Sequence, residues 1–176
     1  MLKNQGIVMV NTGDGKGKTT AALGLALRAI GHDKKVKIIQ FMKGDIAYGE
    51  IVAIKKYLPM IEVVQTGTVD FVDKYNPAEI DLSEAKKGYE LGLEAVKSGE
   101  YDLVILDEIN VAMDFDLISI EKVLALIDQK HPEIDLMLTG RYAPQSIKDR
   151  ADMVTDMTEV KHHFYAGHPA KDGREH

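Results

Sequence analysis

The sequence predicts an α/β protein with a mainly parallel sheet and helices on both faces. Short apolar runs rich in Val and Ile alternate with longer stretches of helical composition, and this alternation is typical of strand–helix units. A glycine-rich turn joins the first apolar run to the first helical stretch. The run Leu103–Leu106 is apolar at every position, so we expect it to be a central strand covered on both faces.

The first half of the chain predicts three strands and two helices. In order they are strand Gly6–Asn11, helix Lys18–Ile30, strand Val36–Phe41, helix Glu50–Tyr57 and strand Ile61–Thr66. The first helix is rich in Ala and Leu and ends at Gly31, while Pro59 stops the second because proline cannot continue a helix. The β-branched residues of the third strand are interrupted at Gly67.

The second half begins with a long polar segment, Thr68–Leu82, which contains Pro77 and is either a functional loop or an irregular connection. The elements expected after it are helix Ser83–Ser98, strand Leu103–Leu106, a helix from its N-cap Ser119 to Lys130, strand Ile134–Thr139, a short helix starting near Pro144 and strand Val154–Val160. We expect residues 1–176 to form one domain, with residues 161–176 as a polar C-terminal tail.

Composition argues against several classes of function. The chain has 22 Lys and Arg against 28 Asp and Glu, and a net charge of −6 disfavours sequence-independent binding of nucleic acid. It has no Cys, which excludes disulfides, a thiolate nucleophile and cysteine-ligated zinc. No apolar run approaches the roughly 20 residues needed to cross a bilayer, and Met1–Gln5 is polar where a signal peptide would become hydrophobic. We expect a cytoplasmic protein without nucleic-acid or membrane partners.

The strongest chemical signal is a glycine-rich segment between the first strand and the first helix. Its residues, the candidate ATP-binding set, are Gly13, Asp14, Gly15, Lys16, Gly17, Lys18, Thr19 and Thr20. Glycines let backbone N–H groups turn toward a phosphate, Lys18 can neutralise the phosphate, and the Thr19 hydroxyl can ligate Mg²⁺. Gly13 and Gly17 enclose three residues, so the loop is one residue shorter than the usual pattern. The alternative is an ordinary glycine-rich turn.

Two carboxylates, Asp107 and Glu108, follow the central strand. We call the glycine-rich segment Gly13–Thr20 the phosphate loop. On a strand next to that of the phosphate loop, such a carboxylate can hold Mg²⁺ directly or through water. The metal candidates are therefore Thr19, Glu108 and Asp107, with Mn²⁺ as an alternative ion. The alternative is that these acidic residues end the strand for solubility alone. The presence of the phosphate loop is what favours a metal site over this alternative.

Three shorter segments also follow strand ends. They are Gln40–Gly44, Thr139–Arg141 and Lys161–His162. Ligands bind at the carboxyl edge of open α/β sheets, so Lys43 and Arg141 are candidates for binding phosphate, with solvated surface charges as the alternative. His162 and the other histidines of the tail lack the spacing of a recognised metal site, which indicates a solvated tail.

With these residues in place, the sequence resembles the bacterial and archaeal P-loop family of ATP:corrinoid adenosyltransferases, also called cob(I)alamin adenosyltransferases. The resemblance covers nearly the whole chain, and the shortened phosphate loop matches the family's own. It rests on GDGKGKTTAALG at Gly13–Gly24, QFMKG at Gln40–Gly44, VILDEINVAM at Val104–Met113, LTGRYAP at Leu138–Pro144 and EVKHHFYAGHPAKDGRE at Glu159–Glu175.

The resemblance implies a RecA-like P-loop fold, a homodimer and a reaction. The 5′-deoxyadenosyl group of ATP would pass to the cobalt(I) of a reduced corrinoid, which is cobalamin, cobinamide or cobyrinic acid a,c-diamide, with release of triphosphate. This step belongs to adenosylcobalamin biosynthesis or salvage, and a reduced flavoprotein is the implied electron donor. Members hold ATP reversed, so that the loop holds the triphosphate and the ribose C5′ points outward to the corrinoid.

The resemblance also implies roles for particular residues. Lys18, Glu108 and Arg141 would be catalytic, with Lys18 and the loop amides stabilising the departing triphosphate. Thr19 and Glu108 would hold Mg²⁺, and Arg141 and Lys16 would add positive charge.

For the corrinoid, typical members carry Phe and Trp shortly after the Thr–Gly pair that corresponds here to Thr66–Gly67. This chain has no Trp and places Phe71 in that region. We therefore assign Phe71, together with Phe41, to the corrinoid side of the site.

Two other classes of protein compete with the transferase. A general P-loop ATPase or small-molecule kinase would use the same loop and carboxylates but would release ADP. A nucleotide-switched binding protein of the partition-regulator type normally has a signature Lys where this chain has Thr12–Gly13. A corrinoid carrier that binds ATP without turnover is a third, weaker alternative.

Overall fold

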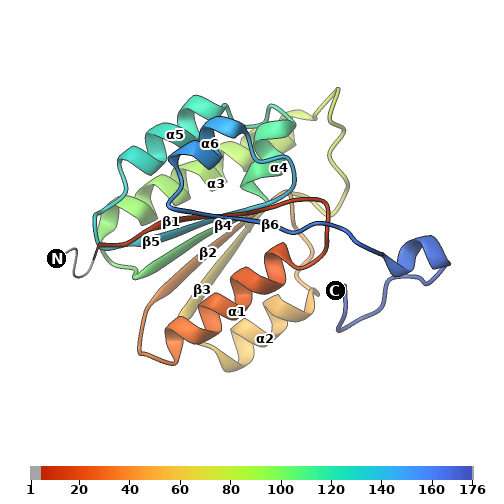
Figure 1. The fold of residues 1–176 in the computed structure, drawn as a ribbon, viewed down its shortest axis with the longest axis horizontal. Helices are drawn as coiled ribbons and strands as arrows, with labels where there is room; N and C mark the ends of the chain where they lie inside the picture. The colour runs from red at the N-terminus through yellow and green to blue at the C-terminus, as the bar shows by residue number, and fades with distance from the viewer. Residues whose placement is uncertain (1–4, 176) are drawn as a thin grey trace.

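A six-stranded sheet forms the centre of the computed structural model, which describes residues 5–175 (Figure 1). The strands are β1 (Val8–Thr12), β2 (Val36–Phe41), β3 (Ile61–Thr66), β4 (Leu103–Asp107), β5 (Asp135–Thr139) and β6 (Met153–Asp156). Their order is β3-β2-β4-β5-β1-β6, and every neighbouring pair is parallel. The prediction of a mainly parallel sheet is confirmed, as is the central position of Leu103–Leu106.

Helices cover both faces of the sheet, as predicted. They are α1 (Lys18–Ile30), α2 (Gly49–Tyr57), α3 (Glu79–Ser98), α4 (Ile109–Asp114), α5 (Ile120–Asp128) and α6 (Gln145–Arg150), and a short 3₁₀ helix, η1, spans His163–Ala166. Figure 1 shows α1 and α2 on one face, and α3, α4, α5 and α6 on the other. Each face has its own core, one built on Ala22 and Ala26 of α1, the other on Val96 of α3 and Leu126 of α5. None of the helices within residues 5–175 has the length and apolarity that crossing a bilayer requires.

The long segment after β3 is shorter than the sequence suggests, because α3 begins at Glu79 and not at Ser83. The Asp81 carboxylate accepts a hydrogen bond of 2.9 Å from the Ala78 backbone N–H, which satisfies a donor that the start of a helix leaves unpaired. This local contact stabilises a helix start at Glu79, although the polar composition of the segment predicts a loop as far as Leu82. Helix α4, which the sequence analysis did not predict, has only six residues.

The last strand ends at Asp156, four residues earlier than predicted, because the chain turns there toward the phosphate loop. The Met157 N–H donates to the Thr12 carbonyl at 2.8 Å, and the Met157 carbonyl accepts from the Gly15 N–H at 2.6 Å. Beyond this point the tail forms η1 and turns back toward the start of α1 (Figure 1).

Helix α3 approaches the sheet closely at Gly88, which is buried. A Cβ atom at this position would overlap the Thr66 hydroxyl and lie 2.8 Å from Cε1 of Phe41. Both neighbours belong to strands and are themselves buried, so neither can yield without moving the sheet. The absence of a side chain at Gly88 therefore sets the distance between α3 and the β2–β3 pair.

We expect Gly88→Ala to lower the free energy of unfolding by about 1–3 kcal/mol, because the added methyl overpacks this contact. Gly24→Ala on α1 is the matched control, since a Cβ there would meet nothing within 4 Å. The control should raise the free energy of unfolding by roughly 0.5–1 kcal/mol through its better helix propensity. Urea denaturation measures both, and equal effects at the two positions would contradict the packing argument.

Candidate active site

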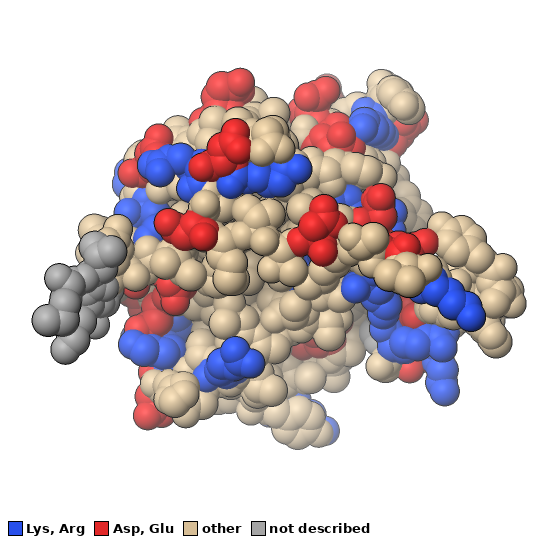
Figure 2. Space-filling model, in the orientation of Figure 1, with Lys and Arg blue, Asp and Glu red and all other residues tan. Residues whose placement is uncertain are grey.

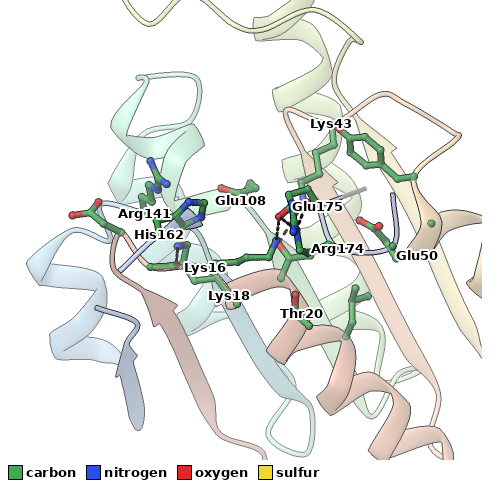
Figure 3. A pocket seen from close by; sticks show the side chains of 18 of the residues that line it. Lys16, Lys18, Thr20, Lys43, Glu50, Glu108, Arg141, His162, Arg174 and Glu175 are labelled. Carbon is green, nitrogen blue, oxygen red and sulfur yellow. Dashed lines mark hydrogen bonds and ion pairs between the residues drawn. The ribbon is translucent and has the colours of Figure 1, made fainter. Parts of the chain in front are cut away.

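A cavity of about 880 Å³ opens at the carboxyl edge of the sheet, and its volume is in the range of pockets for small ligands (Figure 3). Segments far apart in sequence form its walls: the phosphate loop with the first turns of α1, the residues after β2, β3, β4 and β5, and the C-terminal tail. The sequence-predicted residues that line it are Asp14, Gly15, Lys16, Gly17, Lys18, Thr19, Thr20, Lys43, Phe71, Glu108 and Arg141.

Lys18 bonds back onto the phosphate loop. Its ammonium donates to the carbonyl oxygens of Gly13, at 2.7 Å, and Gly15, at 2.6 Å. Burial and the nearby Arg141 charge lower the pKa of Lys18, and Glu108 is among the carboxylates that oppose this shift. An anion satisfies a buried ammonium better than neutral carbonyls do, so a bound phosphate would displace these carbonyls as the partner of Lys18.

The glycines of the loop serve packing as well as phosphate access. Gly13 has a φ of 94°, a left-handed conformation that glycine adopts readily. A Cβ on Gly13 or Gly15 would lie 2.6 Å from the Met157 carbonyl oxygen. The shortened loop thus lies directly against the chain that follows β6, and this contact fixes its position.

Asp107 is the most highly connected side chain of the site and is only 1% exposed. Its Oδ1 accepts hydrogen bonds from the hydroxyls of Thr19, at 2.9 Å, and Thr139, at 2.7 Å. Its Oδ2 accepts from the Gln40 amide at 3.2 Å and from the Lys43 ammonium at 2.7 Å. A single carboxylate therefore joins the first turn of α1 to the ends of β2 and β5.

The expectation that the Asp107 strand neighbours the strand of the phosphate loop is corrected by the sheet order, because β5 lies between β1 and β4. Asp107 nevertheless contacts the phosphate loop, through Thr19. Helix α1 packs across both β4 and β5, and it carries Thr19 over the intervening strand to reach Asp107.

Glu108 faces the cavity, whereas Asp107 lies beneath it. The φ of Glu108 is 65°, and its N–H donates to the Thr139 hydroxyl at 3.0 Å. This left-handed turn directs two consecutive carboxylates to different places, and such strain is typical of functional sites. Burial and the charge of Asp107 raise the pKa of Glu108 despite the opposing Lys43 and Lys18 charges.

The oxygen donors Thr19, Asp107 and Glu108 fit Mg²⁺ or Mn²⁺, which prefer hard oxygen ligands. The Thr19 hydroxyl donates its proton to Asp107, so its lone pairs are available to a cation. Within residues 5–175 no group of three or more His, Asp or Glu side chains could hold a metal ion. A divalent ion here would therefore take further ligands from substrate phosphates and water.

The two phenylalanines assigned to the corrinoid lie in different environments. Phe71 is fully exposed and lines the cavity. Phe41 has no exposed surface and packs in the core beneath α3, so the structure corrects its assignment to the site. It is the last residue of β2, and its side chain points to the α3 face of the sheet instead of the carboxyl edge.

Arg141 follows β5 and is held through the residue before it. Gly140 has a φ of 124°, and its carbonyl accepts a hydrogen bond of 3.1 Å from the buried Asn110 amide of α4. Asn110 was not predicted to be part of the site. Figure 3 shows Arg141 and Lys43 on opposite sides of the cavity.

The tail contributes to the site, which corrects the expectation that it is merely solvated. His162, Arg174 and Glu175 line the cavity. The Glu175 carboxylate lies 3.2 Å from the His163 ring, 2.8 Å from Arg174 and 4.0 Å from the Lys16 ammonium. The family's closing pattern was the signal that could have identified Arg174 and Glu175. Figure 2 shows Lys and Arg gathered on the right of this face, where the tail turns back, while acidic and basic side chains mix elsewhere.

Comparison with known proteins gives one consistent result. The model of a family described as ATP:corrinoid adenosyltransferase BtuR/CobO/CobP matches residues 4–176. A corrinoid adenosyltransferase of Sinorhizobium sp is 34% identical over 172 residues, which cover 97% of this chain and 80% of that protein. A corrinoid adenosyltransferase of Escherichia coli K12 is 34% identical, with 96% and 85% covered. The corrinoid adenosyltransferase CobA of Salmonella typhimurium LT2 is 34% identical, with 97% and 86% covered.

We expect Glu108→Gln to raise the Tm of the protein at pH 8 in the absence of added ligands, because it removes a half-buried charge beside Asp107. The pKa of Glu108 is higher in the folded than in the unfolded chain, so folding disfavours its ionised form. This penalty is absent below about pH 4, where both states are protonated, and complete above the raised pKa. The advantage of the variant should therefore grow as pH rises from 4 and then level off.

Thermal unfolding between pH 4 and pH 8 measures this difference. Glu90→Gln on the exposed side of α3 is the control, and it should change stability by less than about 0.5 kcal/mol. A Glu108→Gln variant that is less stable than the wild type at pH 8 would contradict the expectation.

Proposed function

The chain belongs to the ATP:corrinoid adenosyltransferase family, and we propose that the cavity beside its phosphate loop is where the 5′-deoxyadenosyl group of ATP passes to the cobalt(I) of a reduced corrinoid. The chain is a transferase that acts on corrinoids. The observation that carries this choice of cavity is that the phosphate loop and the exposed ring of Phe71 line the same space.

The reaction is a displacement at the C5′ carbon of ATP. An electron pair of cobalt(I) forms the cobalt–carbon bond, the C5′–O bond breaks, and triphosphate leaves with the pair of that bond. The nucleophile carries no proton, so the step needs no general base. The tasks left to the protein are to orient the two substrates and to stabilise the charge that develops on the triphosphate.

Cationic groups on three sides of the cavity support this role. Lys18 lies in the loop, Lys16 lines the same wall, and Arg141 lies across from Lys43. With ATP reversed, the triphosphate would bind to Lys18 and the loop amides, and Lys16 and Arg141 would add positive charge. Thr20 and the other loop residues from Gly13 to Thr19 complete the ATP-binding set.

Thr19, Glu108 and Asp107 would hold Mg²⁺ or Mn²⁺, which would withdraw charge from the leaving triphosphate. Thr19 and Asp107 already share a hydrogen bond of 2.9 Å, and Glu108 adds a second carboxylate from the cavity side. This arrangement resembles other phosphate-loop sites, in which the ion is held by a loop hydroxyl and a carboxylate at the end of a strand.

Phe71 would form the corrinoid side of the site. Its segment is tied to the rest of the protein by Lys74, whose ammonium lies 2.6 Å from the Asp114 carboxylate and 5.5 Å from the centre of the Phe115 ring. This anchor places an exposed aromatic ring at the cavity without burying it. A flat aromatic face can cover the face of a macrocycle and exclude water.

We infer a cytoplasmic homodimer in which residues 1–176 form one P-loop domain per subunit, and a reduced flavoprotein that supplies cobalt(I). The acceptor is cobalamin, cobinamide or cobyrinic acid a,c-diamide, in biosynthesis or salvage of adenosylcobalamin. Light scattering after size-exclusion chromatography tests the dimer, since a species of only 19.5 kDa would contradict it.

An anaerobic assay tests the central proposal. Chemically reduced cobalamin, ATP and Mg²⁺ are mixed with the protein, and the cobalt(I) spectrum, triphosphate and ADP are followed together. A light-sensitive adenosyl–cobalt product formed in step with triphosphate would establish the transferase, and repetition with cobinamide would address the acceptor. ADP alone would indicate a P-loop ATPase or kinase instead.

We expect Lys18→Ala to reduce the rate of transfer by a factor on the order of 10²–10³, because one charged donor to the developing anion is lost. Lys34→Ala is the control, since Lys34 pairs with Asp102 on the surface at the amino end of β2. Single-turnover kinetics with saturating ATP measures the chemical step. Wild-type turnover by Lys18→Ala would remove Lys18 from the mechanism.

Phe71→Ala should raise the KM for the corrinoid by roughly tenfold through lost aromatic contact, with little change in the KM for ATP. Tyr75→Ala is a matched control, because Tyr75 lies in the same segment and is 92% exposed. Steady-state assays with each substrate varied in turn make the comparison. An equal loss of affinity for ATP and corrinoid would argue against a corrinoid-specific role for Phe71.

A further inference from the structure

The ammonium of Lys43 lies among the oxygens that the proposed metal ion would need. It is 2.7 Å from Oδ2 of Asp107 and 3.3 Å from the Thr19 hydroxyl oxygen. Because Thr19 donates its own proton to Oδ1 of Asp107, it meets Lys43 through a lone pair. A divalent ion held by Thr19 and Asp107 would use these same acceptor atoms.

The backbone that carries Lys43 is fixed. The N–H of Met42 donates to the Thr66 carbonyl at 2.9 Å. A Cβ on Gly44 would lie 2.6 Å from the Gly67 carbonyl oxygen, which shows that two backbone segments pack directly on each other. Only the flexible side chain of Lys43 is therefore free to change position.

The surroundings of Lys43 offer its ammonium a second destination. Its side chain is 18% exposed and lines the cavity that also holds Lys18 and Arg141 (Figure 3). A triphosphate bound to the phosphate loop would lie in that cavity. The four-carbon stem of a lysine spans a distance of several ångströms, so the ammonium could exchange a carboxylate of the protein for an oxygen of the ligand.

We propose that Lys43 is a tethered cation that occupies the metal position in the ATP-free protein and moves onto the triphosphate when the divalent ion and ATP bind. This inference rests on the proposed function, and it assigns Lys43 a positioning role before binding and a charge-stabilising role afterwards. The exchange keeps Asp107 neutralised throughout, by the ammonium first and by the divalent ion later. It also brings a further cation to the leaving group.

The two roles predict effects of opposite sign when the charge is removed. In the ATP-free protein, Lys43→Gln leaves Asp107 without its cationic partner, so Mn²⁺ should bind more tightly, by on the order of tenfold. With Mg²⁺ present, the same variant should bind inorganic triphosphate more weakly, also by on the order of tenfold. A purely structural lysine would not produce this pair of changes.

Electron paramagnetic resonance of free Mn²⁺ gives the first affinity, and calorimetry with triphosphate gives the second. Lys43→Arg keeps the charge and should leave both affinities close to those of the wild type. Lys34→Gln at the amino end of β2 removes a paired surface charge and should change neither. The wild type is assayed in parallel for adenosyl transfer.

Each outcome decides one point. Unchanged or weaker Mn²⁺ binding by Lys43→Gln would overturn the tethered-cation role, and unchanged triphosphate affinity would overturn the transfer to the ligand. If Lys43→Gln folds poorly, Mn²⁺ should restore its Tm, because the ion replaces the missing cation; failure of this rescue would also overturn the proposal. Absence of transfer by the wild type would contradict the proposed function instead, since neither affinity measurement uses a corrinoid.

Discussion

The buried carboxylate of Asp107 is the interaction on which the geometry of the site depends. A charge in this position is tolerated only when it is fully hydrogen-bonded, and its partners come from β2, β5, α1 and Lys43. Strands β2 and β5 end at the carboxyl edge of the sheet, helix α1 begins there, and Lys43 follows β2 at the same edge. Removing the carboxylate would leave Thr19, Gln40 and Thr139 with a lost acceptor, so the positions of the phosphate loop and the strand ends are linked through one residue.

The shortened phosphate loop is a second constraint, and the chain after β6 provides its counterpart. Met157 binds Thr12 and Gly15 through its backbone, and there is no room for side chains at Gly13 and Gly15. The loop is therefore supported by the protein on one side and open to the cavity on the other. The end of β6 at Asp156 is where this support begins, because the next residue, Met157, still pairs with Thr12 of β1 through its N–H while its carbonyl accepts from Gly15 of the loop.

Long apolar elements could be predicted from the sequence because buried strands and helices are rich in apolar residues. Leu103–Leu106 is apolar throughout, and it lies in the middle of the sheet. Glu79 was not predicted as the start of α3, because one contact between Asp81 and Ala78 decides it. Phe41 was placed at the site for its aromatic character, yet Gly88, 47 residues later in the sequence, admits its ring to the core. Such long-range packing cannot be inferred from a local pattern.

The cations of the site were only partly predictable for a related reason. Lys18 and Arg141 follow glycine turns that the sequence displays, whereas Glu175 reaches Lys16 only because the tail folds back. Within the chain these cations have partners: carbonyls for Lys18, Asp107 for Lys43 and Glu175 for Lys16. In the proposed reaction a triphosphate would exchange these partners for its own oxygens as it binds, so that these changes of partner would be complete before the chemical step and little reorganisation would be left for it.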